Sequence, residues 1–423
     1  MYNIISLCGI FVLMAIAWLF SRERQNMNLH VIVAGLLIQA AFSVFIFIFP
    51  AGTWVFMVIN DTIVKVMNAC TSGVEFVFGV LSIPPGQISD SGQKSLGFIL
   101  AFQAFPLLIF FSALMSVLYY LKIMPIIIGF FSRIFTRLMK VSGAESLCVA
   151  SNIFVGVESA LSIKPYMRDM THSEFCTILT GGMATISSSM LAVYVFALID
   201  YFPQIAGHLV SASFLSAPAA LIMSKIIYPE SKSPKTLGIT VIPYQQQEGN
   251  MFEAVINGAT EGGKLIFGIV TLLIAVLGLV SLTDLFLDII GKTINPSFNW
   301  SIKLFLGYIF YPLTLIIGVP FSDVNSIAQI IGERTVVTEM IAYQDLATLI
   351  KNGTITSQRT IVVTTYALCG FAHIASMAIF VGGYAALAPE RTRDLSEVGF
   401  RALLASILAC LETACFAGLF FFD

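Results

Sequence analysis

Long apolar runs recur along the whole chain and constrain its fold more than any other feature. Each run has about 17 to 25 residues, enough to cross ~30 Å of hydrocarbon as a helix. Of the 423 residues, 57% are hydrophobic and only 11% are charged, whereas a soluble domain has about 25% charged residues. The sequence therefore predicts an all-helical polytopic membrane protein, set in a lipid bilayer, without a sizeable soluble domain.

We expect eight full spans. They lie at 4–20, 29–49, 96–121, 175–200, 209–227, 265–290, 360–387 and 398–422. Between the third and the fourth, Arg133, Arg137 and Lys140 share one helical face opposite apolar residues. This pattern is typical of an amphipathic helix in the membrane interface. Residues 60–82 are expected to form a second helix at the surface or periphery.

The basic residues predict the orientation. With the N-terminus outside, the four inner loops hold twelve of the 22 Lys and Arg residues and the outer segments hold four. Because inner loops are enriched in Lys and Arg, both termini are expected outside, which an even number of spans allows. The net charge of −2 argues against a nucleic-acid partner, which would need a basic surface.

Two segments, 144–172 and 320–352, are too polar and too interrupted to be ordinary spans. They lie in corresponding positions before two long spans, and by the predicted orientation they enter from opposite sides. Paired segments of this kind indicate an inverted repeat with two re-entrant hairpins and a binding site at the membrane midplane. Each carries a carboxylate, Glu158 or Glu339, and intramembrane carboxylates are usually functional. The alternative is a structural pair with Lys164 or Arg334.

The long helix after each hairpin is also expected to be broken. One contains "TGGMATISSSM" at 180–190 and the other "ALCGFAHIASM" at 367–377. Glycine and consecutive Ser or Thr residues weaken a helix and leave carbonyls free. Free carbonyls and helix ends suit a sodium ion and a polar solute.

Several motifs occur together and in order. They are "ASNIFVG" (150–156), "GGMATISS" (181–188), "SAPAALIMSKIIYPE" (216–230), "NGATEGGKLIFGI" (257–269), "TEMIAY" (338–343) and "YALCGFAHIAS" (366–376). With these motifs the chain resembles the concentrative nucleoside transporter family over essentially its full length. The resemblance implies a cation-coupled nucleoside symporter that works by alternating access, forms a homotrimer, needs no cofactor and uses Na⁺ as its coupling ion. It also implies a multi-pass protein of the cell membrane, expected to be a bacterial inner membrane.

The resemblance also assigns roles to residues. For the coupling ion it implies oxygen ligands from the Asn152 side chain, the Val155 and Ile186 carbonyls, and the Thr185 hydroxyl and carbonyl. For the solute it implies Val157, Glu158, Met190, Glu339, Phe371, His373 and Ser376. The first hairpin departs from the family pattern because Gly156-Val157-Glu158 is one residue shorter and lacks the usual amide and hydroxyl. His373 stands where the family has an asparagine, and it has a second interpretation as a donor to a backbone carbonyl.

Other functions remain as alternatives. One is an H⁺-coupled symporter of a modified nucleoside or a related ribosylated compound, and less favoured ones are a channel or an intramembrane enzyme. An enzyme would need a cofactor, a metal-ligand set or a nucleophile at recognisable spacing. Glu412, in the last span, is expected either to make a hydrogen bond at a helix contact or to act in coupling. We divide the chain at 1–143, 144–227, 228–264 (an inner loop), 265–319 and 320–423.

Overall fold

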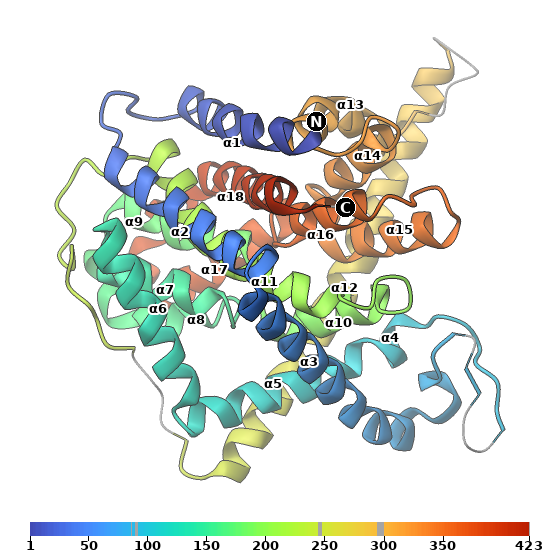
Figure 1. Ribbon diagram of the computed structural model, residues 1–423. Helices are drawn as coiled ribbons and strands as arrows, with labels where there is room; N and C mark the ends of the chain where they lie inside the picture. Colours follow the sequence, from blue (N-terminus) through green and yellow to red (C-terminus); the bar gives the residue numbers. More distant parts are fainter. Residues whose placement is uncertain (86, 89–91, 244–247, 294–299, 423) are drawn as a thin grey trace.

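The computed structural model describes residues 1–423 except 86, 89–91, 244–247, 294–299 and 423 (Figure 1). In this part of the chain the regular structure is helical, with two isolated β-bridges and no strands. The predicted all-helical class is confirmed. The helices are α1 (Tyr2–Leu19), α2 (Leu29–Phe47), α3 (Pro50–Phe78), α4 (Leu100–Gln103), α5 (Phe105–Tyr120), α6 (Ile123–Met139), α7 (Gly143–Asn152), α8 (Ser159–Ile163), α9 (His172–Ala184), α10 (Ser188–Leu198), α11 (Ile205–Ile227), α12 (Met251–Lys292), α13 (Ile302–Ile316), α14 (Val324–Arg334), α15 (Glu339–Lys351), α16 (Gln358–Leu368), α17 (Ile374–Leu387) and α18 (Thr392–Phe420).

Among the described residues, eight helical stretches are long and apolar enough to cross a membrane. Seven coincide with expected spans. The eighth is Pro50–Ser82, which was not among the expected full spans. The expected span 360–387 is not one continuous helix, because it is divided into α16 and α17. The expected surface helix at 60–82 therefore has the wrong start, since α3 begins at Pro50. Its surface or peripheral location stays a prediction.

Helix α12 also begins earlier than expected, inside the stretch 228–264 that was predicted to be a loop. The Asn250 side chain starts this helix by accepting a hydrogen bond of 2.9 Å from the Glu253 amide. Gly258 and Gly262 lie against α5, where a Cβ atom on either would come within 2.8 Å of an α5 Cα atom. Small residues allow such close helix contacts in membranes. The glycines of "NGATEGGKLIFGI" therefore serve packing inside a helix.

The two interrupted segments each fold into a pair of short helices joined by a turn. The first pair is α7 and α8, and the second is α14 and α15. That these hairpins re-enter the membrane from opposite sides stays a prediction. They flank a densely packed centre made by α9, α11, α16 and α18, in which α9, α11 and α16 are buried over almost their whole length.

Both predicted helix breaks are present. The first separates α9 from α10 at residues 185–187, and the second separates α16 from α17 at residues 369–373. The two breaks touch at Gly370, whose φ is +153°. A Cβ atom there would lie 2.7 Å from the Ala184 carbonyl oxygen and 2.6 Å from the Cys410 sulfur, so only glycine fits without displacing its neighbours.

The two chain termini lie side by side (Figure 1). The Asn3 side-chain amide donates hydrogen bonds of 2.9 Å to the Leu419 carbonyl and 3.0 Å to the Phe421 carbonyl. Arg359, at the start of α16, donates to Asn3 Oδ1 and to the Gly418 carbonyl. The start of α1 and the end of α18 therefore lie on the same side of the molecule, which agrees with an even number of membrane crossings.

A buried ion pair that the sequence analysis missed holds the base of the first hairpin. Lys225, 5% exposed, places Nζ 2.7 Å from Glu145 Oε2 and 3.7 Å from Glu230 Oε2. It also donates to the Ser173 hydroxyl at 3.0 Å. These contacts join α7, α9 and the end of α11, and they explain why "SAPAALIMSKIIYPE" combines a lysine and a glutamate.

Replacing Lys225 with methionine is expected to lower the free energy of unfolding by about 3–5 kcal/mol, because it leaves a buried carboxylate unpaired. Chemical unfolding in detergent, followed by tryptophan fluorescence, measures this change. The control is Lys235→Met, which breaks the pair with Asp169, whose side chains are 69% and 49% exposed, and it should have little effect. Equal stability losses for the two variants would contradict the assigned role of Lys225.

Candidate functional site

The residues predicted to bind a solute surround one cavity of about 120 Å³. It lies between the tips of the two hairpins and the two helix breaks, with α12 closing one side. All seven are in its wall: Val157, Glu158, Met190, Glu339, Phe371, His373 and Ser376. Segments far apart in the sequence thus converge at one place, as a binding site requires.

Glu339 is the most constrained carboxylate of this cavity. It is the first residue of α15 and 3% exposed, and a negative charge is favourable at a helix N-terminus. Its Oε1 accepts a hydrogen bond of 2.5 Å from the Tyr194 hydroxyl. Its Oε2 lies 2.9 Å from His373 Nε2, but off the direction of a hydrogen bond. One oxygen is therefore held in place while the other keeps capacity to accept from a solute hydroxyl.

His373 is the N-cap of α17, and both of its ring nitrogens contact Ser376. The Ser376 amide donates to Nδ1 at 3.2 Å, so Nδ1 carries no hydrogen. The neutral ring then carries its hydrogen on Nε2, which lies 2.7 Å from the Ser376 hydroxyl oxygen. The Ser376 hydroxyl accepts this hydrogen and keeps its own hydrogen for another acceptor. His373 thus lines the site, and among the described residues its ring has no bond to a backbone carbonyl.

Glu158 sits at the turn of the first hairpin, just before α8. Its side chain is exposed to the cavity, and its Oε2 lies so close to Gly156 that a Cβ atom there would be 3.3 Å away. The turn is tied to the first helix break by the Ser188 amide, which donates to the Phe154 carbonyl at 2.9 Å. Val157 packs against Gly383 of α17. The short turn is therefore anchored on both sides.

The expected structural pairs of the two carboxylates are absent from the described residues. Neither Lys164 nor Arg334 forms an ion pair with Glu158 or Glu339 there, and the charged neighbour of Glu339 is His373. Both carboxylates are thus left facing the cavity.

The apolar wall contains residues that the sequence analysis missed. Four come from α12, and the signal that would find them is their i, i+4, i+7 and i+8 spacing on one face. Phe380 of α17 extends the aromatic wall, with its ring centre 6.5 Å from that of Phe371. Met190 is 5% exposed. The missed apolar residues are Leu265, Ile269, Leu272, Leu273, Met340, Ile379 and Phe380.

The sequence analysis also missed the polar residues Ser187, Ser189 and Thr338, which line the cavity. Tyr194 is a further polar residue that it missed. It lies one helical turn after Met190 on α10, so its spacing places it on the same face. It is buried, donates to Glu339 and stacks on Tyr343 of α15 with ring centres 4.8 Å apart. Tyr194 therefore fixes the position of the Glu339 carboxylate.

Replacing Tyr194 with phenylalanine is expected to raise the apparent KM for the solute about tenfold, because a hydrogen bond to a charged group contributes about 1.5–3 kcal/mol. The ring stack stays, so the fold should be preserved. Solute uptake against concentration measures the effect, with Tyr308→Phe as control because Tyr308 lies on α13 and is 62% exposed. An unchanged KM in Tyr194→Phe would show that this bond does not position Glu339 for binding.

The residues predicted to bind the ion lie at the first hairpin turn and the first helix break. Asn152 ends α7, and Val155 follows in the turn. Thr185 and Ile186 form the break after α9. Asn152 is fully buried, and its Oδ1 has no hydrogen-bond partner among the described residues. A buried oxygen without a partner is costly, and an oxygen-binding cation would satisfy it.

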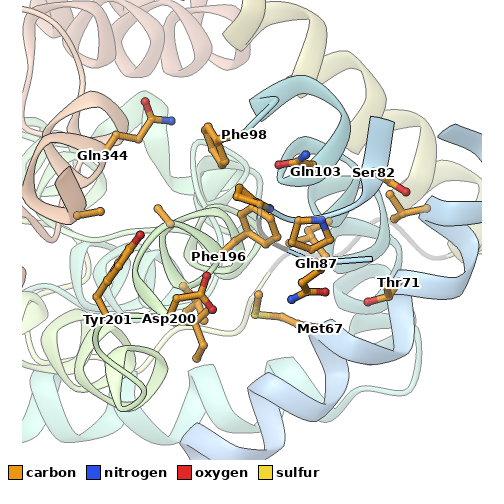
Figure 2. Close-up of a pocket in the computed structure, with 18 of the residues that line it drawn as sticks. Met67, Thr71, Ser82, Gln87, Phe98, Gln103, Phe196, Asp200, Tyr201 and Gln344 are labelled. Carbon is orange, nitrogen blue, oxygen red and sulfur yellow. The ribbon is translucent and has the colours of Figure 1, made fainter. Parts of the chain in front are cut away.

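A second and larger cavity, of about 1110 Å³, lies at the other end of α10 and α15. Figure 2 shows the aromatic rings of Phe98 and Phe196 inside it, with Met67 of α3 on another side. Its described lining includes the polar residues Asn68, Thr71, Glu75, Ser82, Gln87, Gln103, Asp200, Gln344, Thr348 and Lys351. It contains none of the predicted site residues.

The same two helices, α10 and α15, contribute to the walls of both cavities. The N-terminal ends of α10 and α15 line the small cavity, and their C-terminal halves line the large one. The stacked pair of Tyr194 and Tyr343 lies along these helices between the two sets of lining residues. The pair therefore separates the small cavity from the large one.

Three family models match this chain. The model described as Na⁺ dependent nucleoside transporter C-terminus matches residues 208–418, and the one described as Na⁺ dependent nucleoside transporter N-terminus matches 8–81. A model described as Nucleoside recognition matches 101–201, between them. The chain belongs to the concentrative nucleoside transporter family. The family consists of transporters and not of enzymes, which confirms that expectation.

Two bacterial relatives of this transporter match over almost their whole length. An uncharacterized transporter of Haemophilus influenzae is 34% identical, with 98% of this chain and 97% of the relative covered. The nucleoside permease NupC of Helicobacter pylori is 32% identical, with 99% and 98% covered. Each match extends over nearly all of this chain and of the relative, so the similarity is not confined to one segment.

Solved structures show the same fold. The structure of CNTnw in an inward-facing, substrate-bound state is 31% identical to this transporter and superposes with a TM-score of 0.88, with 99% of this chain and 98% of that chain covered. A CNTnw variant in an outward-facing state gives the same identity, TM-score and coverage. CNTnw thus adopts both inward-facing and outward-facing states with the fold that this chain shares.

Proposed function

We propose that this transporter imports nucleosides by Na⁺ symport. The observation that carries the proposal is the small cavity, in which Glu339 and Glu158 face His373 and Ser376 opposite an apolar and aromatic wall. A nucleoside has the matching composition, with ribose hydroxyls that donate to carboxylates and a flat base that stacks on rings. The carboxylates would bind the ribose, and Val157, Met190 and Phe371 would contact the base.

We propose Asn152, Val155, Thr185 and Ile186 as the Na⁺ ligands. They offer amide, hydroxyl and carbonyl oxygens, which suit a hard cation, and the unpartnered Asn152 Oδ1 supports this assignment. The ion would bridge the hairpin turn and the helix break, which already contact each other through the hydrogen bond from the Ser188 amide to the Phe154 carbonyl. Ion binding would thereby order the turn that carries Glu158 and couple the ion to the solute.

We propose alternating access between the two sides of the membrane. The small cavity of about 120 Å³ is below the about 300–1,000 Å³ of usual ligand pockets, so it must widen to admit a nucleoside. The large cavity would be its outer vestibule, since the predicted orientation places the ends of α10 and α15 outside together with both termini. The exposed apolar side chains of α12, including Phe267 and Ile274, would face lipid and the partner subunits of a homotrimer.

The test of this function is a thermal-shift panel on the purified transporter with nucleosides, nucleobases and free ribose, each with and without Na⁺. We expect one or more nucleosides to raise the unfolding temperature, and to raise it more with Na⁺. Ribose alone and nucleobases alone should have smaller effects because each fills one half of the site. A response to a modified nucleoside or another ribosylated compound, or to lowered pH instead of Na⁺, would favour the alternative symporter. No response to any nucleoside would overturn the substrate assignment.

A further inference from the structure

The two hairpins place different side chains at the same topological position. Each hairpin is followed by a broken helix, α9–α10 or α16–α17. The first short helix, α7, ends at Asn152, and the corresponding helix α14 ends at Arg334. The turn after α7 bonds the start of α10 through the Phe154 carbonyl, and Arg334 bonds the Ala367 carbonyl just before the second break. An amide therefore occupies the position in the first half that a guanidinium occupies in the second.

Arg334 is fully buried without a carboxylate partner. Its exposed fraction is 0%, and among the described residues it forms no ion pair. Nη1 donates a hydrogen bond of 3.0 Å to the Ala367 carbonyl, while Nε and Nη2 have no hydrogen-bond partner in the described part of the chain. The side chains near the guanidinium include the weakly polar thiols of Cys410 and Cys369 and the Tyr343 hydroxyl. Burying a charge without a partner has a large free-energy cost. Charged residues inside membrane proteins are therefore usually functional.

The Arg334 guanidinium lies at the C-terminal end of α16. Ala367 is among the last four residues of that helix, whose carbonyls have no partner within the helix. The Tyr343 hydroxyl satisfies a second one, the Thr365 carbonyl, at 2.9 Å. Helix C-termini carry partial negative charge, and in transporters the ends of broken helices bind cations. The guanidinium thus occupies the kind of place where a mobile cation would bind.

The first half shows the opposite imbalance. Among the described residues, no basic side chain donates to the last carbonyls of α9, where the Thr185 hydroxyl bonds Gly181 and the Cys410 thiol faces Ala184. The unpartnered group there is an acceptor, Asn152 Oδ1. The first break therefore lacks a positive charge that the second break already has.

We propose that Arg334 is a tethered cation that replaces, at the second helix break, the mobile ion of the first. It holds the end of α16 against the second hairpin in every state, so that only the first break gains and loses an ion. The two breaks touch through Gly370 and Cys410. When the first break holds its ion, the fixed positive charge of Arg334 therefore also repels a second cation. This inference rests on the proposed Na⁺ symport and adds that the transporter takes one ion per cycle because Arg334 fills the second place.

The first experiment is a charge rescue that does not depend on the coupling ion. Arg334→Ala is expected to lower uptake about 10- to 100-fold, as for the loss of a hydrogen bond from a charged group, and to lower the unfolding temperature. Millimolar guanidinium should restore both, because it fits the space left by the side chain. Urea has the same shape without the charge and should not restore them. Arg334→Met fills the space and should not respond to guanidinium.

The second experiment measures ion dependence in the same variants. Wild type and Arg334→Lys should show Na⁺ activation with a slope of about one, and in Arg334→Ala the slope should increase toward two because a second ion enters the vacated place. Wild-type uptake that ignores Na⁺ would contradict the proposed function and would leave the guanidinium test valid. Equal rescue by urea and guanidinium, or rescue of Arg334→Met, would overturn the tethered-cation assignment, as would an unchanged Na⁺ slope in an active Arg334→Ala.

Discussion

Replacing Glu339 with glutamine is expected to lower nucleoside uptake about 10- to 100-fold, because a hydrogen bond to a charged acceptor contributes about 1.5–3 kcal/mol. The amide keeps the shape of the side chain but loses one of its two acceptor oxygens. Tyr194 would still bond the remaining oxygen, so the oxygen that faces the solute would be the one lost. Uptake of radiolabelled uridine or adenosine into reconstituted vesicles measures the effect.

The matched control for this variant is Glu397→Gln. Glu397 lies on α18, its side chain is 50% exposed and pairs with Arg22, so its replacement should leave uptake near the wild-type value. The Na⁺-dependent thermal stabilisation should survive in Glu339→Gln, because the predicted ion ligands lie in the other half of the chain. Normal uptake in Glu339→Gln would show that its carboxylate does not bind the solute.

Replacing Asn152 with leucine is expected to raise the Na⁺ concentration for half-maximal uptake about 10- to 100-fold. The substitution conserves volume and removes one oxygen ligand, whose interaction with a charge contributes about 1.5–3 kcal/mol. Na⁺ activation of uptake at saturating nucleoside measures the shift. Maximal uptake at high Na⁺ should be partly retained, since the solute site keeps its residues.

The control for the ion site is Asn257→Leu. Asn257 lies on α12 and bonds Glu248 at the surface, so its replacement should leave the Na⁺ curve in place. A lower maximum in Asn152→Leu without any shift along the Na⁺ axis would mean that Asn152 supports the fold or the solute rather than the ion.

The sequence analysis was most successful where local chemistry decides the structure. The breaks at 185–187 and 369–373 follow from glycine and hydroxyl residues that weaken a helix, and both hairpins follow from polar interruptions of short apolar segments. The seven solute residues, once placed by resemblance, meet in one cavity. Their roles in binding stay predictions.

The sequence analysis failed where partners are distant in the chain. The buried ion pair of Lys225 was missed because its partner Glu145 is on another helix. The start of α12 was missed because Gly258 reads as a loop residue unless the close approach of α5 is known. Tyr194 was missed because its partner Glu339 comes from the other half of the chain. In each case tertiary contacts override a local signal.

Glu412 is a carboxylate of the last helix that lies outside the solute cavity. It is fully buried in α18, and neither carboxylate oxygen has a hydrogen-bond partner among the described residues. The expected hydrogen bond at a helix contact is therefore not found in this part of the chain. A role in coupling stays a prediction, which the loss of ion dependence in Glu412→Gln would support.

The measurement that tests the central proposal most directly is nucleoside uptake into vesicles under separate ion gradients. With an inward Na⁺ gradient and equal pH on both sides, we expect radiolabelled uridine or adenosine to accumulate above its external concentration. With an inward proton gradient and no Na⁺, accumulation should be absent. Accumulation that follows the proton gradient and ignores Na⁺ would contradict the proposed symport.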